Sequence, residues 1–175
     1  MTDRATLLFE LGTEELPPKA LRRLSDSLTE QFVSGLEKAG LEHGKVESFA
    51  TPRRLAFRIQ DCMLKQPDRQ IERRGPALKA AFDAEGKATK AAEGFARSCG
   101  TTVDQLSKLE TDKGTWLAYQ VNEKGLPASQ LLPGIAEQAL NKLPIPKRMR
   151  WGASEAQFVR PVHWLLFLHG DDVVD

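Results

Sequence analysis

The stretch Ala5-Thr-Leu-Leu-Phe-Glu-Leu-Gly-Thr-Glu-Glu-Leu-Pro-Pro18 decides how the fold begins. Its first part, 5–11, is an apolar segment typical of a β-strand, and the turn-rich residues 12–18 follow it. Pro18 suits the first turn of a helix, because the N–H that proline lacks would have no partner there. The stretch therefore predicts a strand that passes through a tight loop into a helix.

The residues after Pro18 predict an amphipathic helix that ends near Gly40. Apolar side chains recur every three or four residues, which places them on one helix face. The strand prediction resumes at 46–50, and residues 53–60 alternate apolar and polar, as in a strand with one buried face. The first 64 residues thus predict the order strand, helix, strand, strand. The helix face consists of Leu21, Leu24, Leu28, Phe32 and Leu36.

Residues 66–125 differ in character, and we expect a small α+β insert at about these positions. A short strand is predicted at 70–74, followed by Ala- and Lys-rich helical sequence that breaks at 83–86 and continues to about Cys99. A hairpin is predicted around Asp112-Lys-Gly114, with 116–121 as its later strand.

The last part of the sequence predicts one more helix and a buried strand. Apolar spacing supports a helix over 131–143, in which Pro133 must lie in the first turn or cause a kink. The almost continuous apolar run 162–168 fits a strand that is covered on both faces. The sequence stops in mid-pattern, so we expect a piece of a longer protein. The fold class predicted for 1–175 is α+β, with mixed, largely antiparallel sheets and packed helices.

Composition excludes several classes of protein. Lys plus Arg number 25 and Asp plus Glu 24, a net charge of +1, which excludes a protein that coats nucleic acid by bulk charge but permits a local basic stripe. Cys62 and Cys99 have no CxxC partner, so neither a disulfide framework nor a metal site is expected. No apolar stretch is long enough for a signal peptide or a membrane span, so we expect a cytoplasmic protein.

Catalytic motifs are missing from the sequence. Neither GxGxxG nor GxxxxGK[ST] occurs, so no nucleotide cofactor is expected to bind here. Glu10, Glu14 and Glu15 near the first strand suit a structural or partner-docking role better than acid–base chemistry. His163 could form a hydrolase triad with Ser154 and Glu155, but GxSxG is absent, which favours a structural or docking histidine. We predict no catalytic residue.

Basic residues form local clusters. Arginine and lysine at such positions can neutralise RNA phosphates, and a neighbouring tryptophan can stack on an unpaired base. The alternatives are solvated faces, or arginines that pair with carboxylates in the fold or on a partner protein. The candidate RNA-binding residues are Arg53, Arg54, Arg73, Arg74, Lys147, Arg148, Arg150, Trp151 and Arg160.

An ordered set of motifs resembles the β subunit of bacterial glycyl-tRNA synthetase over nearly the whole chain. The set consists of Leu7-Leu-Phe-Glu-Leu-Gly-Thr-Glu-Glu-Leu-Pro-Pro18, Thr51-Pro-Arg-Arg-Leu55, Arg74-Gly-Pro76, Ala92-Glu-Gly-Phe-Ala96, Pro146-Lys-Arg-Met-Arg-Trp-Gly152 and Phe158-Val-Arg-Pro-Val-His-Trp164. Each motif is weak by itself. Their shared order is what identifies the family.

The resemblance implies an amino-terminal region similar to the B3/B4-type domain of phenylalanyl-tRNA synthetase. It implies an enzyme of two α and two β subunits, in which ATP is used on the α subunit to join glycine to tRNA(Gly). This region would then be a non-catalytic tRNA-binding and subunit-docking module, with the α subunit, tRNA(Gly) and the second β subunit as partners. The alternatives are a purely protein-interaction scaffold and an editing-like hydrolase.

Overall fold

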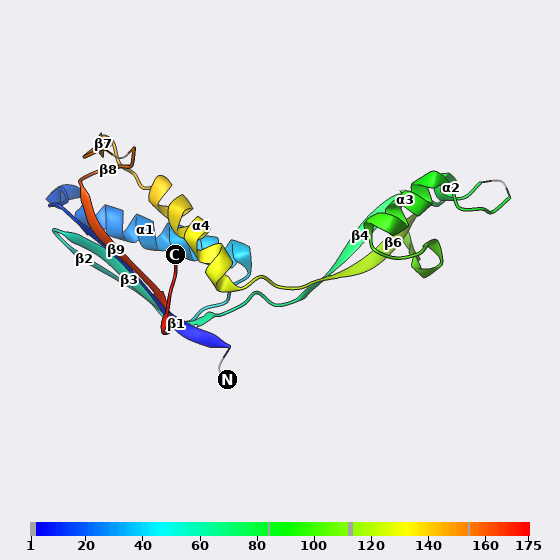
Figure 1. Cartoon of the computed structure of the whole chain (residues 1–175), viewed down its shortest axis with the longest axis horizontal. Helices are drawn as coiled ribbons and strands as arrows, with labels where there is room; N and C mark the ends of the chain where they lie inside the picture. Colours follow the sequence, from blue (N-terminus) through cyan, green and yellow to red (C-terminus); the bar gives the residue numbers. More distant parts are fainter. Residues whose placement is uncertain (1–2, 84, 112–113, 154) are drawn as a thin grey trace. The chain divides into compact units, whose positions relative to one another are not determined.

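The computed structural model describes residues 3–83, 85–111, 114–153 and 155–175 (Figure 1). The chain divides into two compact units. Unit 1 comprises 1–67 and 125–175, and unit 2 comprises 68–124. Both combine helices with antiparallel strand pairs, so the predicted α+β class is confirmed.

Unit 1 is built on a five-stranded antiparallel sheet in the order β10-β9-β1-β3-β2. The strands are β1 (Arg4–Thr13), β2 (Val46–Thr51), β3 (Arg54–Met63), β9 (Val162–His169) and β10 (Asp172–Val173). In the register, Phe9 of β1 lies opposite Phe57 of β3 and Phe167 of β9. The central strand is therefore the one that the opening stretch predicts.

One face of this sheet is covered by α1 (Pro18–Ala39) and α4 (Ala128–Asn141) (Figure 1). Phe9 stacks on Phe57 with ring centroids 5.1 Å apart, and Phe32 of α1 packs on Phe57 at 4.6 Å. Such contacts add about 0.5–1.5 kcal/mol each to the burial of the rings. The aromatic contacts fix α1 against β1 and β3, and the predicted order strand, helix, strand, strand is confirmed.

Helix α1 follows its predicted pattern closely. Leu24, Leu28, Phe32 and Leu36 are buried. The helix ends at Gly40, which adopts φ 67° and ψ 28°, a left-handed conformation that glycine reaches without a steric penalty.

Helix α4 begins earlier than the apolar spacing predicts. It starts at Ala128, whose side chain is buried, and Pro133 lies inside the helix beyond its first turn. Of the two placements that the sequence allows, the first turn and a position that kinks the helix, the structure excludes the first turn. Pro133 instead removes one hydrogen-bond donor from the helix interior.

Strand β9 is not covered on both faces as predicted, and even the face toward the helices is buried only near the end of the strand, since Leu165 on that face is 50% exposed. Phe167 and His169 are buried toward the helices, whereas Trp164, Leu166 and Leu168 alternate with them and point to the other face. Neither α1 nor α4 covers that side (Figure 1). We call it the open face; its apolar side chains are Leu8, Phe49, Ala56, Trp164, Leu166, Leu168 and Val173.

The chain leaves unit 1 and returns to it at neighbouring points. The N–H of Gln66 donates to the carbonyl oxygen of Leu126 at 2.9 Å, and the N–H of Leu126 donates to Gln66 Oε1 at 3.1 Å. Lys65 and Pro127 form an antiparallel bridge. The outgoing segment at 65–66 and the returning segment at 126–127 are therefore hydrogen-bonded to each other within unit 1.

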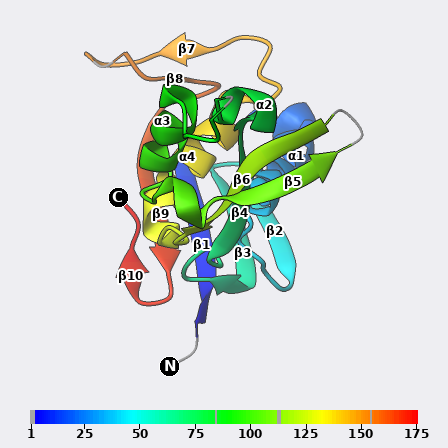
Figure 2. The same cartoon turned by 90° about the vertical axis from the view of Figure 1, so that its right-hand side faces the viewer.

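Unit 2 contains a three-stranded sheet in the order β4-β6-β5 with short helices beside it (Figure 2). Its elements are β4 (Arg69–Ala77), α2 (Leu78–Ala81), α3 (Lys90–Ser98), a 3₁₀ turn at Val103–Gln105, β5 (Ser107–Thr111) and β6 (Gly114–Glu123). Its small core is formed by Ala81, Ala92 and Leu117.

The predicted hairpin of unit 2 is formed by β5 and β6, with Thr111 opposite Gly114. Its turn residues 112 and 113 lie outside the described residues. Strand β4 continues through Gly75 and Pro76, where the sequence predicts its end, because a register shift between Arg74 and Ala77 accommodates the proline. Within the described ranges, no helix is long and apolar enough to cross a membrane.

Candidate functional site

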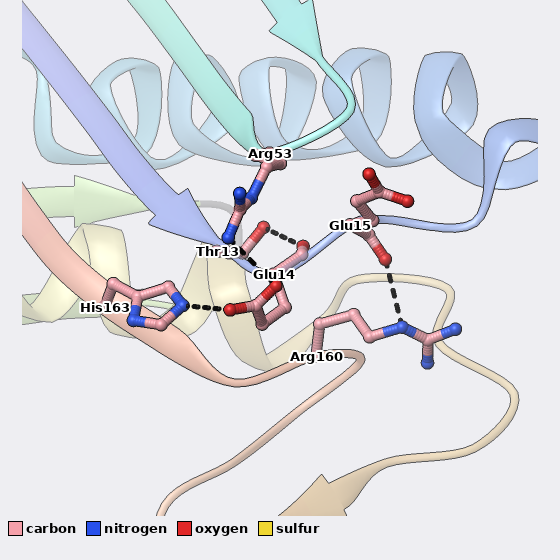
Figure 3. A network of polar contacts seen from close by, with 6 residues as sticks. All are labelled: Thr13, Glu14, Glu15, Arg53, Arg160 and His163. Atoms are coloured by element: carbon pink, nitrogen blue, oxygen red, sulfur yellow. Dashed lines mark hydrogen bonds and ion pairs between the residues drawn. The ribbon is translucent and has the colours of Figure 1, made fainter.

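The loop after β1 is held by two other segments of the chain. The N–H groups of Thr13 and Glu14 donate to the carbonyl oxygens of Arg53 and Pro161, at 2.9 Å each. These acceptors precede β3 and β9, the two neighbours of β1 in the sheet. The side chains gathered here form what we call the Glu14 cluster (Figure 3): Thr13, Glu14, Glu15, Arg53, Arg160 and His163.

Both carboxylate oxygens of Glu14 are engaged. Oε1 lies 2.7 Å from His163 Nε2, and Oε2 accepts from Arg53 Nη2 at 3.0 Å (Figure 3). The hydrogen bond from His163, helped by the charge of Arg53, holds the pKa of Glu14 below its usual value, although desolvation acts in the opposite direction. A carboxylate so arranged is suited to holding a loop and not to donating a proton.

Arg160 binds the backbone of the same loop. Its Nε donates to the carbonyl oxygen of Glu15 and its Nη1 to that of Val159, both at 3.0 Å. Thr13 Oγ1 donates to the carbonyl oxygen of Glu14 at 2.8 Å. Arg53 and Arg160, which the sequence marks as RNA-binding cations, therefore have partners within the protein.

The geometry supplies no nucleophile for His163. Its hydrogen-bond partner is Glu14, and no Ser, Thr or Cys hydroxyl or thiol is bonded to its ring in the part of the chain that the structure describes. Ser154, the residue considered for a triad, lies outside the described residues. Among the described residues, no group of three or more His, Cys, Asp or Glu is placed to hold a metal.

Arg54 lies on the open face beside Glu10 and Trp164. Its Nη1 is 3.6 Å from Glu10 Oε2, and its guanidinium carbon is 5.2 Å from the centre of the Trp164 ring. Gly12 makes room for that ring, because a Cβ at Gly12 would lie 2.2 Å from Trp164 Cε2. Glu10 and Arg54 thus neutralise each other next to an exposed aromatic ring.

Two shallow depressions flank Arg53. The first lies toward the open face and the second toward the start of α1, and Arg53 lines both. The first is lined by Thr13, Thr51, Arg53, Arg54, His163 and Trp164, and the second by Glu14, Glu15, Leu16, Pro17, Pro18, Arg53 and Arg160.

The segment 147–151 has a different environment. Arg150 belongs to β7 (Met149–Arg150), which pairs with β8 (Gln157–Phe158). Arg148 Nη2 donates to the carbonyl oxygen of Asn141 at 2.9 Å, whereas Lys147 and Arg150 are exposed and form no ion pair among the described residues. Trp151 lines a mainly apolar pocket next to them, together with Leu11, Leu140, Phe158, Val162 and Leu165.

Arg73 and Arg74 belong to β4 of unit 2. Arg73 Nη2 lies 3.9 Å from Glu123 Oε1, and the guanidinium carbon of Arg74 lies 3.7 Å from the centre of the Trp116 ring. Both arginines therefore have a partner within unit 2.

A second basic surface was not predicted from the sequence. Lys19, Arg22 and Arg23 of α1 line a groove with Lys142, which follows the end of α4. In the sequence these residues look like the solvated face of a helix. The spacing i, i+3, i+4 of the three cations on α1 was the available signal, since it places them on one side of the helix.

Comparison with known proteins settles the family. The family model described as "Glycyl-tRNA synthetase beta subunit" matches residues 7–175. This chain belongs to that family. The predicted resemblance is confirmed, and the motifs that carry it lie within the matched residues.

Curated relatives in this glycyl-tRNA synthetase β-subunit family are named glycine–tRNA ligase β subunit. That of Marinobacter nauticus is 60% identical over 96% of this chain, and that of Erwinia tasmaniensis is 57% identical over 99%. That of Salmonella arizonae is 57% identical over 97%. The chain covers 24%, 25% and 24% of these proteins respectively, so it spans about a quarter of the length of the curated relatives it matches.

Proposed function

We propose that this chain is a non-catalytic tRNA-binding and subunit-docking region of a cytoplasmic glycine–tRNA ligase. Glycine activation with ATP takes place on the α subunit, and tRNA(Gly) and a second β subunit are the other partners. The observation that carries the proposal is the segment 147–151, where exposed cations without acidic partners among the described residues adjoin the pocket of Trp151.

The chemistry of this segment matches an RNA strand. Lys147 and Arg150 are available to phosphates, because no carboxylate of the described residues pairs with them. Trp151, which is only half-buried, offers an aromatic surface on which an unpaired base can stack, a contact worth about 1–3 kcal/mol per base, and the buried Phe158 lines the floor of the same pocket. In this proposal Arg148 fixes the segment to α4 through Asn141.

The arginines with internal partners have a supporting role in this proposal. Arg53 and Arg160 hold the loop after β1, and Arg73 and Arg74 are paired within unit 2. Moving any of them to a phosphate would leave an acidic group, a carbonyl or an aromatic ring without its partner. They therefore contribute less to tRNA affinity than Lys147 and Arg150.

The open face supports docking of the α subunit. Trp164 and Phe49 are 41% and 50% exposed there. The charges on this face are paired with each other, Arg58 with Glu47 at 2.6 Å and Arg54 with Glu10. An apolar surface whose charges are already neutralised suits a protein partner better than a polyanion.

Salt-dependent binding tests the RNA part of the proposal. In Lys147→Gln/Arg150→Gln, binding of a tRNA(Gly) transcript weakens, and the slope of log K against log salt concentration flattens by about 0.7–0.9 for each phosphate that the variant no longer neutralises. Lys38→Gln, at the exposed end of α1, is the matched control and keeps the original slope. An unchanged slope in the double variant would remove the segment from the RNA surface.

Co-purification tests the docking part. Phe49→Asp places a charge on the open face without disturbing the core, so the α subunit is no longer retained on the immobilised chain. Leu126→Asp is the control, since Leu126 is 46% exposed and lies on the segment before α4. Equal retention of the α subunit by both variants would exclude the open face as its docking surface.

A further inference from the structure

The groove between α1 and the end of α4 has an excess of positive charge that the fold does not use. Four exposed basic side chains line it, against Asp26 and Glu30 on the acidic side. The four are Lys19, Arg22, Arg23 and Lys142.

The acidic residues of the groove do not neutralise these cations. Arg22 Nε lies 3.7 Å from Asp26 Oδ2, but the Arg22 side chain is 96% exposed. The pair has the cation on the N-terminal side, which is the less favourable orientation along a helix. Lys19, Arg23 and Lys142 form no ion pair among the residues that the structure describes.

Helix stability does not account for the three cations of α1 either. Lys19, Arg22 and Arg23 are spaced i, i+3, i+4, so they repel one another along one side of α1. The first turn of α1 contains no acidic residue, and Lys19 stands at the positive end of the helix dipole. A bound anion would reduce both the repulsion among these cations and the repulsion between Lys19 and the positive end of the helix.

The groove adjoins the segment 147–151. Pro144 lines the groove, and Arg148 is bonded to the carbonyl oxygen of Asn141, one residue before Lys142. Figure 1 shows α4 packed along α1 and leading into β7. Basic side chains therefore continue from α1 past the end of α4 to Lys147.

This arrangement favours the RNA backbone over an acidic protein surface. The lining is charged or polar apart from Pro144 and carries none of the exposed apolar side chains found at the centre of protein interfaces. A phosphodiester chain instead presents regularly spaced negative charges and requires only cations along its path.

We infer that the α1–α4 groove binds the phosphodiester backbone of the tRNA whose unpaired base stacks at Trp151. This inference rests on the proposed function and deepens it. The groove residues position the RNA and hold no catalytic role.

The test compares two sets of substitutions in the whole chain. Lys19→Gln/Arg23→Gln/Lys142→Gln removes the groove cations, and Lys147→Gln/Arg150→Gln removes those of the neighbouring segment. Binding of a tRNA(Gly) transcript is measured by fluorescence anisotropy over a range of salt concentrations, with Lys38→Gln as the control. We expect the groove variant to flatten the salt slope by about 0.7–0.9 for each cation in contact with a phosphate.

A melting curve separates binding from folding. Because Lys19→Gln and Arg23→Gln relieve repulsion along α1, which offsets the loss of Lys142 from the negative end of α4, the groove variant melts at about the same temperature as the wild type while its RNA affinity falls. A purely structural role would lower the melting temperature instead. That result, together with an unchanged slope, would overturn the inference.

The outcomes distinguish the inference from the function on which it rests. If the segment variant alone flattens the slope, the groove inference is wrong and the proposed function stands. If neither variant does, both are wrong. If the groove variant keeps its RNA affinity but no longer retains the α subunit, the groove binds an acidic protein and the inference is again overturned.

Discussion

Glu14 is the residue through which three separate parts of the chain meet. Its carboxylate is bonded to Arg53 and His163, and its N–H to the carbonyl oxygen of Pro161. These contacts form because β1 lies between β3 and β9 in the sheet, although β9 is far from β1 and β3 in the sequence. The consequence is that Glu14, together with Arg160 and the backbone hydrogen bonds of Thr13 and Glu14, holds the loop leading from β1 into α1.

Glu14→Gln tests this role through pH. Because the folded-state pKa of Glu14 is lowered, its carboxylate contributes stability that is present above the ordinary value of 4.5 and is lost as the pH falls through the folded pKa. We expect the variant to unfold at a lower urea concentration than the wild type at neutral pH, and the difference to close below pH 4.5. Glu15→Gln is the control, since the cluster uses only the carbonyl of Glu15. An equal decrease in both variants would contradict the role of Glu14.

His169 predicts a second pH effect in a different range. It is 5% exposed and its Nε2–H donates to the carbonyl oxygen of Cys62 at 3.2 Å. Burial lowers the pKa of His169 below its ordinary value of 6.5, although the bond to Cys62 and the charge of Asp172 oppose this shift. The neutral ring therefore adds stability above pH 6.5 that is lost as the pH falls through the folded pKa.

Urea unfolding measured from about pH 7.5 to about pH 5 checks the His169 effect. His169→Gln keeps a donor for Cys62 but does not titrate, so its free energy of unfolding changes less over this range. The wild-type chain measured over the same range is the reference. If the free energy of unfolding of His169→Gln varied with pH as steeply as that of the wild type, the pH effect would not come from His169.

At the level of elements, the periodic segments could be predicted from the sequence. The spacing of Leu24, Leu28, Phe32 and Leu36 is enough for α1, because one apolar face and a terminal glycine define a helix locally. The start of α4 could not be predicted this way. Apolar spacing alone does not show whether the segment 128–130 joins the helix, and the burial of Ala128 is a tertiary effect.

The apolar run of β9 shows another limit. Continuous apolar residues fit a strand with two covered faces, yet neither α1 nor α4 covers Trp164 and Leu166. The sequence pattern indicates that burial of both faces of the strand is favourable, whereas only the structure shows which face α1 and α4 bury. The Glu14 cluster could not be predicted from the sequence either, because its residues are brought together only by the register of β1 with β3 and β9.

The crossing of α1 and α4 gives a prediction about packing. A Cβ at Gly35 would lie 2.5 Å from Ile135 Cγ2, and the branched Ile135 side chain is stiff. We expect Gly35→Ala to lower the free energy of unfolding by about 1–3 kcal/mol, as overpacked sites do. Ile135→Ala in the same chain makes room, so the double variant is more stable than the sum of the two single effects would give.

Gly134→Ala is the matched control for this crossing. Gly134 also lies inside a helix, but a Cβ there meets no atom within 4 Å. It should raise the free energy of unfolding by up to about 1 kcal/mol, because alanine favours helix. Thermal and urea unfolding of the four variants measure the coupling. Stabilisation by Gly35→Ala would show that α1 and α4 are not in close contact there.

At the scale of the whole molecule, the division into two units predicts that unit 2 can be deleted while unit 1 still folds. Gln66 and Leu126 are hydrogen-bonded to each other, so the ends left by deleting 68–124 already lie side by side. We expect a chain closed there by a short glycine–serine linker to keep the fold of unit 1. Circular dichroism and a cooperative melting curve check this. A deletion variant without a cooperative transition would show that unit 1 requires unit 2 to fold.

The central position of β1 in the sheet leaves one of its edges unpaired during much of translation. One edge of β1 pairs with β3 early in synthesis, but the other waits for β9, at 162–169. Unit 2 is complete in the nascent chain before that partner emerges. During translation the unpaired edge of β1 is therefore a site at which neighbouring nascent chains can associate, and a chaperone bound at this stage would protect it.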